Sequence, residues 1–426
     1  MVTFLLIAVF VIGYLAIAFE HPLQLNKAAP ALITGVLCWT IYLLQGTDPH
    51  TAVEELMHHL GEIASILFFL LGAMTIVELI DSHNGFEIIT EKITATRKSS
   101  LLLLIAAITF FLSALLDNLT TAIVMTSLCA KILSDKEDKL WFAGMIVIAA
   151  NAGGAWSPLG DVTTTMLWIG GQITALNIIK QLFLPSLVVG IVPALLIARR
   201  FAGQTLVLRT QSTTTATEKK EGSIILFSGL GFLVFVPAFK TITHLPPFMG
   251  MLLALGCMWI ITTLLHKRKE AELAEKFTVA KALQRIDSSS ILFFLGILLA
   301  VAALQSVGIL TQLAVFLSTH LQNDYLIGAT LGVLSALVDN VPLVAASQGM
   351  YDLATYPTDH AFWEFLALTT GTGGSMIIIG SAAGVAVMGI EKIDFVWYLK
   401  KIGWLALLGF LGGILTFILQ HALHLY

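Results

Sequence analysis

Three aspartates, Asp117, Asp161 and Asp339, interrupt long apolar stretches of this chain. The segments around them supply hydroxyl and amide oxygens and contain no Lys, Arg or His. Small hard cations prefer oxygen ligands and negative charge, and a carboxylate can hold either a proton or a cation. This combination favours a site that exchanges a small hard cation for H⁺, with the three aspartates as cation ligands and no resident cofactor. The further candidate ligands are Asn118, Asn151, Thr163, Thr164, Ser335, Asn340 and Ser375.

The composition excludes most soluble classes of protein. Of the 426 residues, 57% are hydrophobic and 12% are charged, and the mean hydropathy is +0.89. Soluble domains carry about 25% charged residues, so this chain cannot cover a water-soluble fold of its size. The net charge of −4 provides no basic surface for nucleic acid. We therefore expect an all-α polytopic membrane protein, and neither an enzyme nor a nucleic-acid binder.

The elements that would position these residues occur twice along the chain. Ser113-Ala-Leu-Leu-Asp-Asn118 returns as Ser335-Ala-Leu-Val-Asp-Asn340, and Asn151-Ala-Gly-Gly returns as Gly371-Thr-Gly-Gly. Both matches keep the same order, which favours an internal repeat. Repeats with interrupted helices are typical of secondary transporters, whose sites lie where the interruptions meet.

The distribution of Lys and Arg predicts how the first repeat is oriented. These residues gather in the segments 81–98, 131–139, 199–222 and 266–287, and such segments usually face the cytoplasm. The stretch 99–130 then enters and leaves from one side, which predicts a re-entrant hairpin with its tip at Asp117. Such a turn is tolerated only where it is buried in protein or lines a cavity.

The second repeat has the opposite pattern of charge. Its equivalent segments, 306–323 and 351–361, contain no Lys or Arg. The second hairpin, about 324–350, should therefore enter from outside. Glycines and Pro158 predict a broken membrane span at 140–177, with a counterpart in the second half.

The expected fold thus has two inverted-topology repeats, each with a re-entrant hairpin and a broken transmembrane helix, in about ten crossings plus two hairpins. The predicted divisions are 1–60 (N-terminal scaffold helices), 61–200 (first inverted repeat), 201–222 (cytoplasmic linker), 223–287 (scaffold hairpin and cytoplasmic loop) and 288–426 (second inverted repeat).

Some of these residues also have plain structural explanations. Asp117 and Asp339 could cap the helices that follow them. The glycine pairs could simply permit close helix packing. Asp161 is different, because the repeat places Ser381 at the equivalent position and symmetry does not require an acid there. Asp161 is therefore the better candidate for the proton carrier.

The two Ser-Ala-Leu-x-Asp-Asn segments, the stretch Asn151-Ala-Gly-Gly-Ala-Trp-Ser-Pro-Leu-Gly-Asp-Val-Thr-Thr164 and the segment Gly371-Thr-Gly-Gly-Ser375 resemble the NhaD-type sodium/proton antiporters of the ion-transporter superfamily. The resemblance extends from about residue 61 to 420. It implies export of sodium, with lithium as a second cargo, against protons in a bacterial inner membrane. It also implies a lipid-embedded homodimer in which a transport domain moves against a scaffold. The residues that match the family's site are the ten candidates named above, whereas Gly371 departs from a strictly two-fold site.

Three other readings remain open at this point. A carrier of the same superfamily for arsenite, citrate or a dicarboxylate would share the fold, although acids without a compensating base disfavour a dianion. An intramembrane aspartyl protease needs two facing aspartates, for which Asp161 and Asp352 are poor matches. A channel would not need alternating hairpins.

Overall fold

The computed structural model describes residues 2–18, 20–44, 48–86, 88, 95, 97–205, 216–267, 277–337 and 339–423. Regular secondary structure in these residues is helical, apart from one isolated bridge between Arg97 and Thr205. The predicted basic segment 81–98 and the predicted linker 201–222 lie partly outside the described residues.

The first half contains the site-bearing helices α6 to α9 and the helices around them. In chain order they are α1 (Val2–Ala18), α2 (Glu20–Leu23), α3 (Ala28–Leu44), α4 (Pro49–Ser82), α6 (Lys98–Ser113), α7 (Asn118–Ile132), α8 (Lys136–Ala155), α9 (Val162–Ile169) and α10 (Ala175–Arg200). Because α4 is continuous, the predicted boundary between residues 60 and 61 lies inside a helix.

The second half follows the same order after its first pair of helices. It consists of α11 (Ala216–Thr243), α12 (Pro247–His266), α14 (Val279–Arg285), α15 (Ser288–Ser306), α16 (Ile309–Leu321), α17 (Asp324–Leu334), α18 (Asn340–Met350), α19 (Ala361–Gly373), the 3₁₀ turn η1 (Ile378–Gly380), α20 (Ala382–Glu391), α21 (Phe395–Tyr398), the π turn η2 (Leu399–Gly403) and α22 (Trp404–Ala422). The first turns of α11 precede the predicted end of the linker at residue 222.

Several helices are long and apolar enough to cross a bilayer. Among the described residues these are α4, α10, α11, α12, α15 and the helical stretch Phe395–Ala422. Large apolar side chains such as Phe227, Leu264 and Leu415 are exposed on them. Exposed apolar surface on this scale suits lipid and not water. The chain is a multi-pass, all-helical membrane protein, as the composition predicted.

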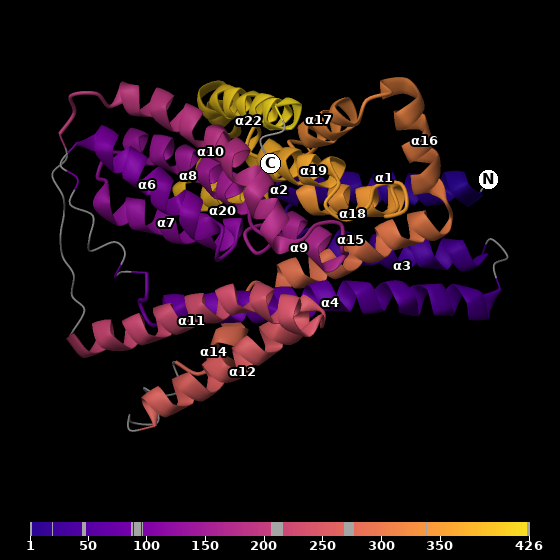
Figure 1. The fold of residues 1–426 in the computed structure, drawn as a ribbon, viewed down its shortest axis with the longest axis horizontal. Helices are drawn as coiled ribbons and strands as arrows, with labels where there is room; N and C mark the ends of the chain where they lie inside the picture. The colour runs from indigo at the N-terminus through magenta and orange to yellow at the C-terminus, as the bar shows by residue number, and fades with distance from the viewer. Residues whose placement is uncertain are drawn as a thin grey trace.

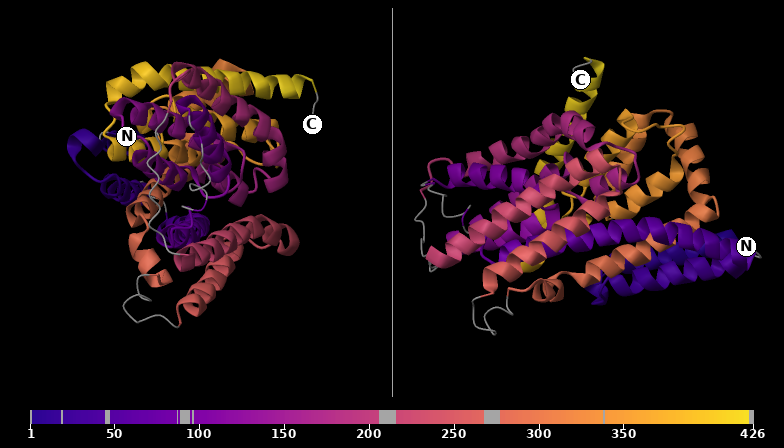
Figure 2. Two further views of the ribbon diagram at one scale, coloured as in Figure 1. Left: turned by 90° about the vertical axis from the view of Figure 1, so that its left-hand side faces the viewer. Right: turned by 60° about the horizontal axis from the view of Figure 1, so that its bottom comes forward.

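The two halves pack by the same rule. Helix α6 lies against α8 and α17 lies against α19, while α3 packs on α15 and α12 packs on α4. Figures 1 and 2 show α4, α11 and α12 along one side of the molecule and α6, α8, α10 and α22 along the other. Between the halves, α7 contacts α20 and α18 contacts α9. Each short hairpin helix therefore meets the broken helix of the other half.

Glycine permits the closest of these approaches. A Cβ on Gly153 would clash with the backbone of Phe110, and one on Gly373 would clash with the backbone of Gly332. These glycines hold α8 against α6 and α19 against α17, so the packing explanation is correct for both.

Candidate functional site

Asp161 lies where helix α8 has ended and α9 begins. Residues 156–161 interrupt the helical hydrogen bonds, and the Asp161 carboxylate caps α9 by accepting from Thr163 N at 2.9 Å. The Thr164 hydroxyl donates to the Asp161 backbone carbonyl at 2.9 Å. The residue is only 1% exposed. A helix N-terminus stabilises negative charge, so this position suits an ionised carboxylate.

Two asparagines from separate hairpins donate to this carboxylate. Asn118 Nδ2 lies 2.7 Å from Asp161 Oδ2, and Asn340 Nδ2 lies 3.2 Å from the same oxygen and 3.3 Å from Oδ1. Asn118 begins α7 and Asn340 begins α18, so the N-termini of two short helices, one from each half of the chain, converge on one acid. No Lys or Arg in the described part of the chain forms an ion pair with Asp161.

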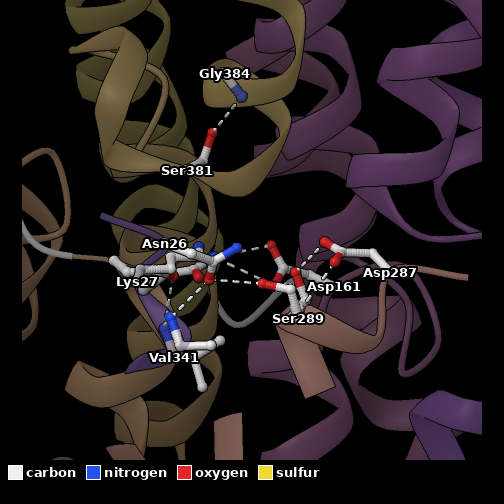
Figure 3. A network of polar contacts seen from close by, with 12 residues as sticks. Asn26, Lys27, Asp161, Asp287, Ser289, Val341, Ser381 and Gly384 are labelled. Atoms are coloured by element: carbon white, nitrogen blue, oxygen red, sulfur yellow. Dashed lines mark hydrogen bonds and ion pairs between the residues drawn. The ribbon is translucent and has the colours of Figure 1, made fainter. Parts of the chain in front are cut away.

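Asn151 extends this network to the second broken helix. Its amide oxygen accepts from Asn118 Nδ2 at 3.1 Å, and its Nδ2 donates to Ser375 Oγ at 2.9 Å and to Ser381 Oγ at 3.0 Å. Ser381 in turn caps α20 by accepting from Gly384 N at 3.1 Å (Figure 3). Asn151 therefore connects the second helix break to the Asp161 carboxylate through Asn118.

A small space adjoins Asp161 on the side of Gly371. A Cβ on Gly371 would stand 3.7 Å from both Asp161 Oδ2 and Thr163 Oγ1. The Thr163 hydroxyl is fully buried, and no hydrogen bond of ordinary geometry to another described residue uses it, although it lies close enough to interact with the Asp161 carboxylate. A buried hydroxyl beside a carboxylate is an oxygen pair that a small cation can use.

Asp117 and Asp339 occupy equivalent positions in the repeat but accept different hydrogen bonds. Both carboxylate oxygens of Asp117 cap α7. Oδ1 accepts from Thr120 N at 2.7 Å, and Oδ2 accepts from Thr120 Oγ1 at 2.8 Å. Its φ of 139° is a conformation that favours glycine, so the cap offsets a backbone cost. At the second tip, Pro342 replaces Thr120 and offers neither an N–H nor a hydroxyl.

Asp339 has a basic partner that the sequence did not predict. Its Oδ1 accepts only a long bond from Val341 N at 3.5 Å, and its Oδ2 pairs with Lys27 Nζ at 3.3 Å (Figure 3). Lys27 precedes α3, far from the repeats in sequence. The hairpins and breaks themselves hold no base, as expected, but the site as a whole is not base-free. A single lysine between two apolar stretches carries no signal beyond that of an ordinary surface turn.

The remaining candidates separate into distinct roles. Ser335 Oγ donates to Thr370 O at 2.7 Å, which mirrors the bond from Ser113 Oγ to Ala150 O at 2.6 Å. Ser335 thus ties its hairpin to α19 and does not reach Asp161. The described residues contain no group of three or more His, Cys, Asp or Glu that could hold a metal ion. The assignment of sodium to Asp117, Asp161 and Asp339 stays a prediction.

The sequence matches known transporters over nearly its whole length. Residues 14–373 match the citrate transporter family CitMHS. The chain is 47% identical to sodium/proton antiporter 1 of Arabidopsis thaliana, across 97% of this chain and 72% of that protein. It is 33% identical to the Na⁺/H⁺ antiporter NhaD of Vibrio cholerae, across 96% of this chain and 90% of that protein.

The chain belongs to the NhaD-type sodium/proton antiporter family. Arabidopsis sodium/proton antiporter 2 is also 45% identical, across 97% of this chain and 98% of that protein. The resemblance found in the repeated motifs is thereby confirmed. NhaD-type proteins form a family of transporters and not of enzymes, which removes the intramembrane protease from consideration.

Proposed function

We propose that this NhaD-type chain exchanges Na⁺ for H⁺ across its membrane and that Asp161 binds the two ions in turn. The observation that carries the proposal is the buried Asp161 carboxylate, which has amide donors from both hairpins and no ion-pair partner. Li⁺ is the second cargo that an oxygen-rich site of this kind suits.

Competition between the two ions follows from the cost of buried charge. An ionised carboxylate inside a membrane protein is expensive unless a proton or a cation compensates it. The amide donors of Asn118 and Asn340 stabilise the ionised carboxylate when neither a proton nor a cation is bound. Rotation of either amide exchanges its NH₂ donor for a carbonyl oxygen. The same asparagines can therefore serve an empty site and a cation-bound site.

The proposal includes an inverted architecture of two re-entrant hairpins and two broken spans in about ten crossings. Contacts at opposite ends of the molecule support it. At one end, Lys98 pairs with Asp138 and Arg200 pairs with Glu137, which joins the open ends of α6, α8 and α10. At the other end, the open ends of α17 and α19 lie together, because Tyr356, in the loop that leads into α19, donates to Asp324 at 2.8 Å.

We also propose the division into scaffold and repeats and the homodimer that the sequence predicted. We propose scaffold segments 1–60 and 223–287, repeats 61–200 and 288–426, and a connecting segment 201–222. A homodimer embedded in lipid is part of the proposal. The bacterial inner membrane stays a prediction, since the matching relatives come from a plant and from bacteria.

Everted vesicles provide the test of function. Vesicles that contain the protein, energised to be acid inside, should release protons when Na⁺ is added, as reported by a pH-sensitive dye. Vesicles without the protein, and addition of choline chloride, are the controls. No response to Na⁺ or Li⁺ would overturn the proposal. Because the chain also matches the citrate transporter family, labelled citrate should be tested in parallel, and uptake of citrate without cation exchange would favour that carrier instead.

Cysteine labelling tests the inverted architecture. In a chain whose own cysteines are replaced, Gln322→Cys in the second half should react with an impermeant reagent from outside. Ser100→Cys, at the start of α6, should react only from the cytoplasmic side. Both positions are exposed, so access depends on the side of the membrane. Labelling of both from one side would contradict the inversion.

A further inference from the structure

Lys27 is a charged residue that neither the repeats nor the family resemblance assigns to the site. Its ammonium lies 3.3 Å from Asp339 Oδ2 and 4.3 Å from the centre of the Phe293 ring. Phe293 is fully buried in α15, and the side chains of the ion pair are only 18% and 14% exposed. The pair is therefore shielded from solvent far more than a typical surface salt bridge.

The position of Lys27 is poor for the helix that follows it. Asn26 accepts from Ala28 N at 2.9 Å, and Lys27 is the residue that directly precedes the N-terminus of α3. A positive charge there is disfavoured by the helix dipole. Helix stability thus gives no reason for a lysine at this position, whereas Asp339 and the face of Phe293 both compensate its charge.

Asp339 is free to exchange partners in a way that Asp117 is not. Pro342 removes the two donors that Thr120 gives to Asp117, and among the described residues the Asp339 carboxylate caps α18 through the 3.5 Å contact from Val341 N alone. A carboxylate with one weak backbone bond and one ammonium keeps most of its binding capacity for another cation. The next residue, Asn340, donates directly to Asp161.

The ion pair also joins two groups of helices. Lys27 precedes α3, which packs on α15 and α1, whereas Asp339 lies in the turn between α17 and α18 and caps α18. Whatever occupies Asp339 therefore influences both the attachment of this turn and the approach of Asn340 to Asp161.

We propose, on the basis of the proposed exchange function, that Lys27 is a tethered cation that neutralises Asp339 in the sodium-free protein and is displaced when sodium binds. Lys27 is a positioning residue in this scheme, because it acts on Asp161 through Asp339 and Asn340. Without Lys27, sodium loses a competitor. The empty carrier then has to reorient with an uncompensated Asp339 charge.

The test compares Lys27→Gln with Lys27→Arg and with a matched control. Lys98→Gln removes a lysine–aspartate pair of similar exposure, with side chains 20% and 12% exposed, at the start of α6. Exchange kinetics in vesicles provide KM for Na⁺ and the maximal rate per folded protein. The rise in Tm of the purified protein with NaCl provides a readout of sodium binding that does not require transport.

Lys27→Gln should lower both the KM for Na⁺ and the maximal rate, each about twofold to fivefold, the upper part of the range expected for an ion pair that is not fully buried. The NaCl concentration that produces the half-maximal rise in Tm should fall by the same factor. Lys27→Arg should stay close to the parent, and Lys27→Gln should have no further effect in an Asp339→Asn background.

Three results would overturn the assignment. An unchanged KM together with a lower Tm would show that Lys27 only stabilises the fold, as would equal effects of Lys27→Gln and Lys98→Gln. Persistence of the Lys27→Gln effect without Asp339 would show that it acts elsewhere. If the parent shows neither exchange nor a Na⁺-dependent Tm, the proposed function fails, and the role of Lys27 fails with it.

Discussion

The two broken helices share a frame but not a chemistry. In each, the second glycine of the pair packs against the backbone on the far side of the break, with Gly154 beside Gly160 O and Gly374 beside Gly380 O. Each hairpin is also tied to its broken helix by a serine hydroxyl. The functional positions differ, because Asn151 and Asp161 in the first half correspond to Gly371 and Ser381 in the second. The repeated frame brings two asparagine-bearing tips together, and the unrepeated residues place a single acid between them.

The largest effect should come from removing that single acid. The amide introduced by Asp161→Asn can neither bind nor release a proton. The variant should therefore reduce exchange to the level of vesicles without the protein at every pH. Asp161→Glu keeps a titrating group on a longer stem and should retain part of the activity with a shifted pH profile. Dye-monitored exchange, normalised to inserted protein, provides the measurement. Near-normal exchange by a folded Asp161→Asn variant would transfer the carrier role to Asp117 or Asp339.

The next effect concerns the side chain that connects the two breaks. Asn151→Ala leaves Asn118, Ser375 and Ser381 without their shared partner. Loss of partners for buried polar groups costs about 1–3 kcal/mol each, so we expect roughly a tenfold loss of exchange together with a lower Tm. Asn151→Asp is the matched variant of the same size, and it places a second acid near Asp161. A Tm and an exchange rate equal to the parent in Asn151→Ala would contradict the bridging role.

The sequence predicted the fold class and the places where helices are interrupted, because both depend on local pattern. The apolar composition, the glycines and Pro158 were sufficient to place the break before Asp161. The different hydrogen bonding of Asp117 and Asp339 depends on a single position, which is Thr120 in the first half and Pro342 in the second. The effect of that exchange becomes clear only when the hydrogen bonds at both helix N-termini are known. Lys27 could not be predicted at all, since its contact joins residues from opposite ends of the chain.

The continuity of α4 is a second feature that the sequence pattern did not predict. The predicted boundary between residues 60 and 61 falls in a polar stretch of α4, where His58 and Glu62 lie one turn apart at 3.6 Å and form an ion pair when His58 is protonated. Such pairs stabilise an exposed helix locally, so it continues without a break into the apolar span. Sequence pattern marks where burial changes, and a change in burial need not end a helix.

A smaller effect should follow from making the two breaks more alike. Gly371→Asn restores the residue that internal symmetry would place there and puts an amide beside Asp161 Oδ2. The new donor should compete with the cation and raise the KM for Na⁺ about threefold to tenfold, as one hydrogen bond with a net contribution of about 1 kcal/mol can. Gly371→Ala is the control, because its nearest neighbour would be Ala155 Cβ at an ordinary 3.4 Å. A KM for Gly371→Asn no higher than that of Gly371→Ala would argue against a cation space at this position.

The smallest effect distinguishes the two tips. Asp117→Asn keeps a side-chain oxygen that can cap α7, so exchange and Tm should both stay close to the parent. Asp117→Ala removes the cap while the backbone keeps its unfavourable φ, and the protein should lose about 1 kcal/mol of stability without a change in KM. Thermal unfolding of the two variants in detergent, together with their KM for Na⁺, provides the measurement. A clear rise in KM for Asp117→Asn would mean that Asp117 binds the cation directly, and the two tips would then be equivalent in function as well as in sequence.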